Sequence, residues 1–340
     1  MNKIWQLFDE AFVLDYFRRK LLPLYPAFKE IKRVEIKPYK KLIWETTYHV
    51  VIGFNVYFLA KGKKEIKIPI ICSAHSDEAR ENVFIGLNYL WEKKINRSGI
   101  DLPRPLFFSH HFNGTFYRAL NGENLLHYII NKDRASIEKI TRESAELFAR
   151  LHALSVGPEA NFNPLNARIQ TVIPGTAMIF SEMRARYHGK YTPTLEAIYD
   201  ILAKREAVFF ASGAPLKLIH GDAHPENIIK TGEDRIGLID FTDLCLSDFA
   251  RDLGAFIQQV EYKINMKVSD SLFADKIKNI FLETYLDAAG LELDASLRAR
   301  IDLYYNWTAI RTSTYWFLKA GHNEERGEAL LNMVKNNLKI

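Results

Sequence analysis

The sequence predicts an α+β protein with two lobes, an antiparallel sheet with one helix in residues 1–120 and a mainly helical part in residues 121–340. Residues 33–75 indicate the first lobe, because charged or glycine-containing breaks divide their many β-branched and aromatic side chains into strands. Residues 135–154 indicate the second, since their apolar side chains recur at helical spacing. We find no repeat and no low-complexity linker, so we expect a short joint around residues 118–123 and a cleft between the lobes.

The first lobe should begin with an amphipathic helix that ends near two prolines. The apolar positions of this helix and the two prolines are Ile4, Leu7, Phe8, Phe12, Tyr16, Pro23 and Pro26. Three strands are expected at residues 34–39, 46–60 and 65–75, followed by a helix whose apolar face recurs at steps of three and four in residues 80–91. The dipeptide Asn113-Gly114 then predicts a tight turn between two further short strands.

The second lobe should contain a long helix over residues 135–154, followed later by a small group of strands. The strands are the apolar runs LKLI, NIIK and IGLIDF, which a loop and a turn at Gly232 separate. A further helix is expected after Asp248, which lies in its first turn as a cap.

Composition limits the classes of partner. Lysine and arginine number 46 against 41 aspartates and glutamates, and this small excess is scattered along the chain, so we expect no nucleic-acid partner. No segment reaches the ~20 uninterrupted apolar residues of a membrane helix, and acidic residues interrupt the amino-terminal helix, so neither a membrane span nor a signal segment is expected. Cys72 and Cys245 are the only cysteines, both in apolar stretches, which is typical of a reducing, cytoplasmic compartment.

The segment LIHGDAHPENII, residues 218–229, places five polar side chains between apolar flanks. Because the flanks predict strands, we expect a loop that exposes Asp222 and Asn227, followed by a hairpin that carries Asp240. Three oxygen-bearing side chains would then meet at one place. Hard cations such as Mg²⁺ prefer oxygen ligands, so the pattern predicts a site for such a cation.

Two segments, His220-Gly221-Asp222-Ala223-His224-Pro225-Glu226-Asn227 and Ile239-Asp240-Phe241, resemble the catalytic loop and metal-binding segment of the aminoglycoside phosphotransferase and choline kinase superfamily. That superfamily is distantly related to protein kinases. The runs ELFARLHAL upstream and SDFARDLGAF downstream occur in the family's order, and the resemblance covers about residues 33–260. It implies a bilobal protein-kinase-like fold and an enzyme that uses ATP or GTP with Mg²⁺ to phosphorylate a hydroxyl of a small molecule.

The resemblance also implies a role for each residue of the motif. Asp222 would orient the acceptor hydroxyl and accept its proton, while Asn227 and Asp240 would hold Mg²⁺ on the nucleotide phosphates. His220 would brace the catalytic loop as a hydrogen-bonded structural residue. Asp252 would hold that loop through backbone N–H groups, since a carboxylate beside an apolar helix face needs donors; a partly exposed surface acid is the alternative.

The first lobe departs from the family pattern. Its third strand should carry a lysine that holds the nucleotide phosphates, but IPIICSAHSD contains none, and Ser73 or Cys72 stands in its place. Arg80 is our candidate replacement, because an arginine on the inward face of a helix needs an anionic partner. The alternative for Arg80 is an ion pair with Asp77 or another acid near the helix start. Further candidates from other positions are Lys40, Lys41 and Lys67.

The strand that ends at residues 117–121 resembles the connector between kinase lobes, whose backbone N–H and C=O groups bind a purine edge. The backbone of Tyr117 and Ala119 is therefore expected to bind the nucleotide base. Acceptor specificity is assigned to residues 160–210 and to the carboxy-terminal helices. The net charge gives no support for the acidic cleft that a polycationic aminoglycoside would favour.

Three alternatives to a small-molecule kinase remain open. A nucleotide-binding regulatory protein with little or no catalysis fits the missing lysine, although the catalytic and metal-binding residues are all present. A metallohydrolase would use His220, Asp222 and His224 as ligands of a transition metal, but the other histidines show no matching spacing. A protein acceptor is disfavoured, because no activation segment separates Asp240 from Asp248.

Overall fold

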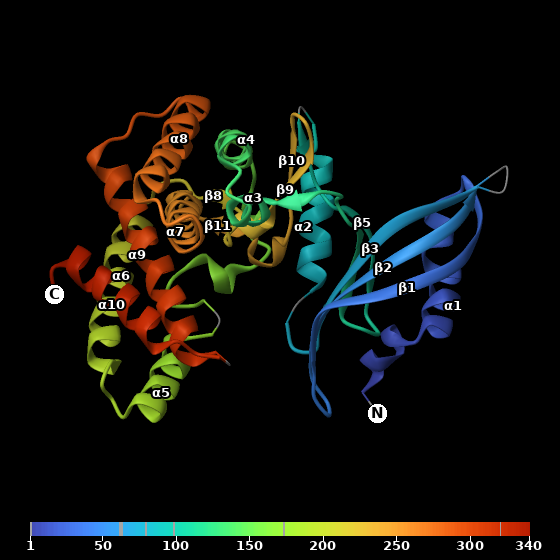
Figure 1. Cartoon of the computed structure of the whole chain (residues 1–340), viewed down its shortest axis with the longest axis horizontal. Coiled ribbons are helices and arrows are strands. Elements are labelled where there is room, and N and C mark those ends of the chain that lie inside the picture. The colour runs from blue at the N-terminus through green and yellow to red at the C-terminus, as the bar shows by residue number, and fades with distance from the viewer. Residues whose placement is uncertain (1, 61–63, 79, 98, 173, 320) are drawn as a thin grey trace. The chain divides into compact units, whose positions relative to one another are not determined.

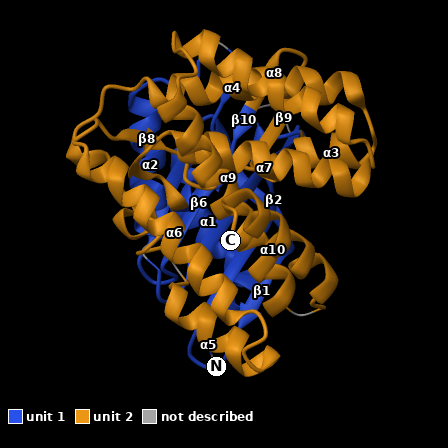
Figure 2. Ribbon diagram, turned by 90° about the vertical axis from the view of Figure 1, so that its left-hand side faces the viewer, with its two compact units in different colours: residues 1–122, 237–242 blue, residues 123–236, 243–340 orange. Residues whose placement is uncertain are grey.

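A computed structural model describes residues 2–60, 64–78, 80–97, 99–172, 174–319 and 321–340 (Figure 1). The chain divides into two compact units (Figure 2). The first comprises Met1–Gly122 and Gly237–Thr242, and the second comprises Glu123–Ile236 and Asp243–Ile340. The segment Gly237–Thr242 therefore packs with the amino-terminal residues, although in sequence it follows the histidine-rich motif at residues 220–227 by only ten residues.

The first unit is built on a five-stranded antiparallel sheet in the order β1-β2-β3-β6-β5. Its strands alternate buried and more exposed side chains, as expected for a sheet with one face in the core. Two-residue β4 lies outside this sheet. The strands of this unit are β1 (Phe28–Ile43), β2 (Tyr48–Ala60), β3 (Glu65–His75), β4 (Ile100–Asp101), β5 (Arg104–Ser109) and β6 (Gly114–Arg118).

Helix α1 (Glu10–Lys20) covers one face of this sheet, where Phe17 meets Phe54 edge to face at 5.1 Å (Figure 1). The single amino-terminal helix that the sequence predicts is in fact two pieces, because a 3₁₀ helix, Lys3–Phe8, precedes α1. The break has a local cause: the carboxylate of Asp9 accepts the Phe12 N–H at 2.8 Å and so caps a new helix.

Helix α2 (Glu81–Glu92) packs beside β5 and β6, where the sequence predicts a helix. The predicted turn between these two strands is also present, and Asn113 within it has a φ of 37°. The Asn113 amide donates to the main-chain carbonyl of His75 at 2.6 Å. This bond fixes the turn against the carboxyl end of β3, next to the start of α2.

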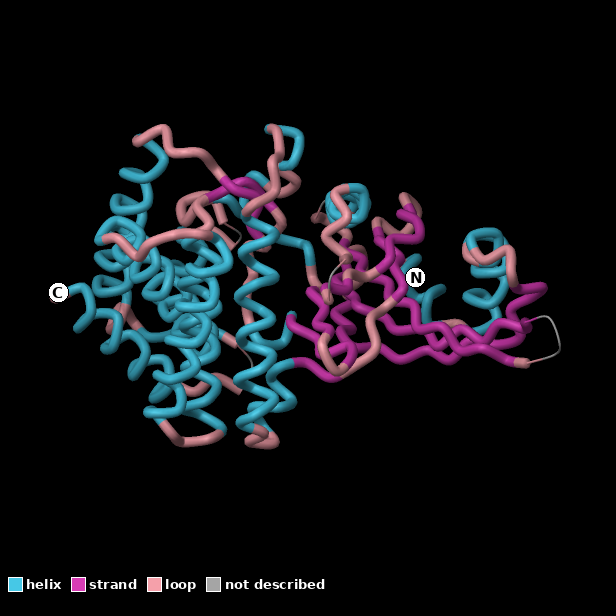
Figure 3. Tube along the Cα trace, turned by 90° about the horizontal axis from the view of Figure 1, so that it is seen from above, coloured by secondary structure: helices cyan, strands magenta, loops and turns pink. Residues whose placement is uncertain are grey.

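The second unit is mainly helical (Figure 3). Helix α7 is its most buried helix and packs against α8 and α9, while α4 packs against α8. The helices are α3 (Leu125–Ile130), α4 (Arg134–His152), α5 (Thr176–Tyr187), α6 (Thr192–Ala211), α7 (Ala250–Lys267), α8 (Ser271–Ala289), α9 (Ala295–Leu318) and α10 (Glu324–Leu338). None of the helices that the structure describes has the length and apolar character needed to cross a membrane.

Short strands frame the histidine-rich motif, as the sequence predicts. Strand β8 (Lys217–Ile219) enters it and pairs antiparallel with β11 (Cys245–Ser247). A 3₁₀ helix, Pro225–Asn227, leads out of it into β9 (Ile228–Gly232). The remaining strands are β7 (Glu123–Asn124), which pairs with β9, and β10 (Arg235–Leu238).

Candidate active site

Asp252 of α7 fixes the backbone of the loop that carries the motif. Its fully buried carboxylate accepts the N–H of His220 at 2.7 Å and the N–H of Gly221 at 2.9 Å. Gly221 is required here, since its φ is 82° and a Cβ would lie 2.4 Å from the carbonyl oxygen of Asp243. This is the arrangement that the family resemblance implies for Asp252.

His152, which the sequence analysis does not predict as a site residue, links three helices at Asp252. His152 of α4 places Nε2 3.1 Å from the Asp252 carboxylate and Nδ1 2.9 Å from the hydroxyl of Tyr285 in α8. Burial raises the pKa of Asp252, but the bond and charge of His152, the charge of His220 and the Gly221 N–H together lower it more, so the pKa is held below its usual value. His220 itself is fully buried, as a structural histidine of the loop should be.

Asp222 lies in the loop with a side chain that remains 48% exposed. The amide nitrogen of Asn227 donates to the main-chain carbonyl of Asp222 at 2.9 Å, which ties the two ends of the motif together. This bond leaves Oδ1 of Asn227 without a partner among the residues that the structure describes. An amide oxygen held in this way is a suitable ligand for Mg²⁺.

A series of charged side chains in contact with one another extends from Asp222. Nε2 of His224 lies 3.2 Å from the Asp222 carboxylate, and its Nδ1 lies 2.9 Å from Glu226, which in turn bonds Lys263 of α7. Burial lowers the pKa of His224, but the two carboxylates raise it more, to about 10. Burial raises the pKa of Asp222, but the charge and hydrogen bond of His224, with the charges of His220 and Arg311, together lower it well below its usual value. Asp222 is therefore a carboxylate at neutral pH.

Asp240 belongs to the first unit and has an unusual backbone. Its φ of 62° lies in the left-handed region, which a residue with a side chain rarely adopts and which often marks a functional site. One carboxylate oxygen accepts the hydroxyl of Thr242 at 2.7 Å, and that hydroxyl accepts the guanidinium of Arg80 at 2.7 Å. Arg80 also pairs with Glu78 at 2.6 Å, so it has the acidic partner near the helix start that the alternative interpretation expects. The same side chain reaches the segment of Asp240.

Ser73 and Tyr117 lie on the sheet face opposite α1. Ser73 is paired with Thr115, and Tyr117 is paired with Ile71, in adjacent rows across β3 and β6. Burial and the charge of Asp240 raise the pKa of the Tyr117 hydroxyl, while Arg80 acts in the opposite direction. The first unit therefore gathers Ser73, Arg80, Tyr117 and Asp240 on one side of the sheet.

A backbone hydrogen bond limits how Ala119 could bind the nucleotide base. Its N–H donates to the carbonyl of Pro69 at 3.0 Å and is therefore not available to a purine, whereas its own carbonyl accepts no backbone N–H from the residues that the structure describes. The three candidate lysines of the first unit have different surroundings. Lys41 lies over the ring of Trp5 at 4.6 Å, and Lys67 is exposed in β3, whereas Nζ of Lys40 lies 3.4 Å from His49. His49 in turn lies 3.4 Å from the Arg80 guanidinium, so Lys40 is the lysine nearest to Arg80 in this series of contacts.

The second unit thus brings together Asp222, Asn227, His220 and Asp252, and the first unit holds Asp240. The residues that support the loop from other helices, His152 and Lys263, could not be predicted from the sequence. His152 lies within an ordinary helical stripe, and Lys263 lies 37 residues beyond its partner Glu226. Spacing along a helix cannot predict a partner on another helix.

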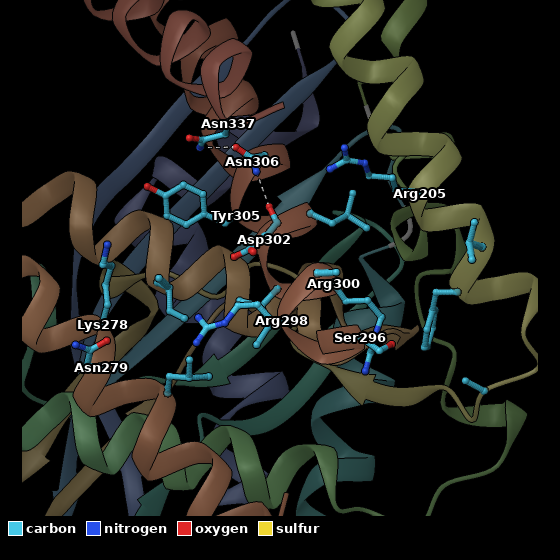
Figure 4. A pocket seen from close by; sticks show the side chains of 18 of the residues that line it. Arg205, Lys278, Asn279, Ser296, Arg298, Arg300, Asp302, Tyr305, Asn306 and Asn337 are labelled. Carbon is cyan, nitrogen blue, oxygen red and sulfur yellow. Dashed lines mark hydrogen bonds between the residues drawn. The ribbon is translucent and has the colours of Figure 1, made fainter. Parts of the chain in front are cut away.

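Two further features concern ligand sites. In the part of the chain that the structure describes, no group of three or more histidine, cysteine, aspartate or glutamate side chains could hold a metal ion. A groove of about 1180 Å³ lies in the second unit among α6, α7, α8 and α9 (Figure 4). Its walls carry Arg205 and Arg298 and none of the predicted site residues.

The fold is similar to those of several solved structures. An ethanolamine kinase of Plasmodium vivax superimposes with a TM-score of 0.53 at 18% identity, covering 88% of this chain and 81% of that one. A choline kinase of Streptococcus pneumoniae gives 0.52 at 15% identity, covering 96% and 98%. A spectinomycin phosphotransferase in complex with ADP and spectinomycin gives 0.54 at 12% identity, covering 96% and 94%. These likenesses confirm the predicted kinase-like α+β fold, with its antiparallel sheet and mainly helical carboxy-terminal part.

A comparison with curated proteins finds no significant match to the sequence. The family model described as "phosphotransferase enzyme family" matches residues 75–300, which is more than half of the chain and includes the whole of the histidine-rich motif. The resemblance inferred from the sequence is therefore confirmed. On this match and on the geometry of the loop, the chain belongs to the phosphotransferase enzyme family.

Proposed function

We propose that the protein is a Mg²⁺-dependent kinase that transfers the γ-phosphate of ATP or GTP to a hydroxyl of a small molecule. The observation that carries this proposal is the loop from His220 to Asn227. Its backbone is anchored by a buried acid, yet it presents a half-exposed, ionised carboxylate at Asp222. A fixed loop with one accessible carboxylate is what phosphoryl transfer requires, since the enzyme mainly positions reactants and neutralises charge.

Asp222 would orient the acceptor hydroxyl and accept its proton. A carboxylate with a lowered pKa is a weak base, and this suits a loose transition state in which the hydroxyl loses its proton late. His224 would keep the carboxylate ionised and in place through its bond to Asp222. Asp252, with His152, would keep the loop backbone fixed during the reaction.

Mg²⁺ would be held by Asn227 and Asp240. The donor set fits the ion, because it consists of an amide oxygen with no partner among the described residues and a carboxylate with one oxygen outside the Thr242 bond. When bound, Mg²⁺ would neutralise charge on the nucleotide phosphates.

The nucleotide would lie against the sheet face that carries Ser73 and Tyr117. Arg80 would take the place of the family's lysine, because its guanidinium is held by an acid on one side and reaches the Asp240 segment on the other. Lys40 would add a second positive charge through His49. The purine would bind backbone groups between Tyr117 and Asn121, including the carbonyl of Ala119.

The test is a screen for ATP and GTP consumption over many hydroxylated metabolites. We expect at least one acceptor to be phosphorylated, and Asp222→Asn to lower turnover by about 10²- to 10⁴-fold while nucleotide binding is retained. Asp222→Asn is nearly isosteric, so melting temperature and circular dichroism should match the wild type. Unchanged turnover in Asp222→Asn would show that Asp222 is not the residue that orients the acceptor hydroxyl and accepts its proton.

A nucleotide-binding regulatory protein remains the second candidate. The observation that favours it is the absence of a lysine at Ser73 in β3. It predicts nucleotide binding by calorimetry with no product from any acceptor, and with hydrolysis unaffected by Asp222→Asn. Product formation that depends on Asp222 would exclude it.

A further inference from the structure

Arg311 of α9 is a partly buried arginine without an acidic partner. No residue that the structure describes forms an ion pair or a side-chain hydrogen bond with its guanidinium. The guanidinium instead lies over the indole ring of Trp307, 5.0 Å from the ring centre. Stacking on a ring that is 3% exposed limits the freedom of the side chain, so the positive charge is held in a defined place.

The position of Arg311 is linked to the catalytic loop. The same Trp307 ring also contacts Arg251, whose guanidinium carbon lies 4.7 Å from the ring centre. Arg251 donates to the main-chain carbonyl of Gly221 at 3.3 Å, and Gly221 directly precedes Asp222. The charge of Arg311 also acts to lower the pKa of Asp222. Burial, which raises this pKa, and the charges of His224 and His220, which lower it, have larger effects. It is not within ion-pair distance of Asp222, so the carboxylate remains available to an acceptor.

Two acids of this unit are already paired with protein cations. Glu226 bonds His224 and Lys263, and Glu261 of α7 pairs with Lys278 at 2.9 Å and accepts the hydroxyl of Tyr305 at 2.8 Å. A cationic acceptor would have to compete with these protein cations for a carboxylate. An anionic acceptor would find Arg311 without a competing acid.

We propose that the acceptor is a small hydroxylated anion, carrying a carboxylate or a phosphate monoester that the Arg311 guanidinium binds while its hydroxyl faces Asp222. This inference rests on the proposed kinase function and specifies its substrate class. It separates this protein from the ethanolamine kinase, the choline kinase and the spectinomycin phosphotransferase, since those three acceptors carry amino or ammonium groups. A planar guanidinium suits either anion, because its N–H groups match carboxylate and phosphate oxygens in pairs.

The test uses acceptors that differ only in charge. One series is glycerate, glycerol and 3-aminopropane-1,2-diol; a second is glucuronate, glucose and glucosamine; glycerol 3-phosphate supplies the phosphate. For each compound, kcat and KM are measured with Mg²⁺ and ATP or GTP, and binding is measured by calorimetry with a non-hydrolysable nucleotide analogue. We expect kcat/KM and affinity to be highest for the anionic members, and a preference for glycerate or for glycerol 3-phosphate tells carboxylate from phosphate.

Variants then assign the preference to Arg311. Arg311→Gln should raise KM and weaken binding about 10- to 100-fold for the anionic acceptors, with a much smaller effect on the neutral ones. Arg311→Lys should recover part of the loss, because it keeps the charge without the paired N–H geometry. The matched control is Arg298→Gln, an exposed arginine on the same helix that lines the groove of Figure 4; it should behave as wild type.

Several results would overturn this inference. Preference for the amino or neutral compounds, or calorimetry without binding of any anionic member, would reject an anionic acceptor. An equal loss of kcat for all acceptors in Arg311→Gln would assign the residue to the transferred phosphate instead. If the amino compounds are phosphorylated in an Asp222-dependent way, the kinase function stands and only the substrate class fails. If no compound is phosphorylated, the kinase function fails, and the calorimetric comparison of Arg311→Gln with Arg298→Gln still decides the anion site.

Discussion

Arg80 shows how one side chain can satisfy two different interpretations. An arginine that is 4% exposed must be compensated, and Glu78 supplies the charge at 2.6 Å. The guanidinium is a fork, however, and another of its nitrogens reaches Thr242, which bonds Asp240. A lysine could not make both contacts with its single nitrogen in the same geometry. The ion pair and the proposed role with the nucleotide are therefore compatible.

At this scale we expect Arg80→Ala to weaken the binding of Mg²⁺-nucleotide by about tenfold or more, because a charge-assisted contact with phosphate is lost. Arg80→Lys should bind better than Arg80→Ala but less tightly than wild type, since it keeps the charge and loses the fork. Calorimetry with ATP and with GTP measures both effects.

Two lysines on the same sheet provide the controls for Arg80. Lys41→Ala removes a cation that lies over Trp5, and Lys67→Ala removes one that is exposed in β3, so neither should change nucleotide affinity. A loss at either lysine equal to that at Arg80 would mean that overall positive charge, and not the placement of Arg80, accounts for binding. Unchanged affinity in Arg80→Ala would remove Arg80 from the nucleotide site.

At the scale of elements, α7 and α9 approach each other closely beside Asp252, which holds the backbone of the loop at His220 and Gly221. Gly254 lies one half-turn beyond Asp252 on α7, and a Cβ at Gly254 would lie 2.5 Å from the carbonyl oxygen of Ile301 and 2.6 Å from the nitrogen of Tyr305. Both atoms belong to the backbone of α9, so they cannot move as a flexible side chain would. Glycine at 254 therefore sets the distance between the two helices.

Gly254→Ala should destabilise the protein by about 1–3 kcal/mol, because overpacking against a helix backbone outweighs the higher helix propensity of alanine. Since α7 also carries Asp252, the variant should lose activity in parallel. Urea unfolding followed by circular dichroism measures the stability change. Gly175→Ala is the control: a Cβ there meets nothing within 4 Å, and only a weaker helix cap, about 1 kcal/mol or less, is expected. Equal effects at the two glycines would contradict the packing argument.

At the scale of the whole molecule, the two units contribute different groups. The first holds Asp240 and the candidates for nucleotide contact, and the second holds Asp222 and Asn227. A ligand that binds only the folded protein raises the free energy of unfolding by an amount that depends on its concentration relative to Kd. Nucleotide with Mg²⁺ is expected to act in this way.

We expect Mg²⁺ with ATP or GTP, at 100 times Kd, to raise the free energy of unfolding by about 2.7 kcal/mol and hence to raise Tm. EDTA should remove most of this effect, Asp240→Ala should abolish it, and Asn227→Ala should reduce it, because both residues are proposed ligands of the ion. Zn²⁺ should not replace Mg²⁺. A thermal shift by nucleotide that is the same in EDTA would reject the proposed metal ligands; activity that requires stoichiometric zinc would favour the metallohydrolase.

Local pattern determined much of the fold. The alternating strands of residues 34–75, the stripe of α4 and the Asn113 turn could be predicted because their causes lie within a few residues. The amino-terminal helix was predicted without its break, since an apolar stripe continues through Asp9 although the carboxylate there caps a new helix. The motif from His220 to Asn227 was also evident, because its chemistry is confined to one loop.

Tertiary structure alone decided what surrounds that loop. His152 supports Asp252 across 100 residues of sequence, and Arg311 is linked to the loop of Asp222 through Trp307 and Arg251. The placement of Arg80 beside Thr242, 162 residues away, likewise followed from folding and not from spacing. The sequence could thus predict the residues of the candidate site, since most of them lie together in one short loop. It could not predict their partners, because burial and charge compensation depend on which helices and strands meet in space.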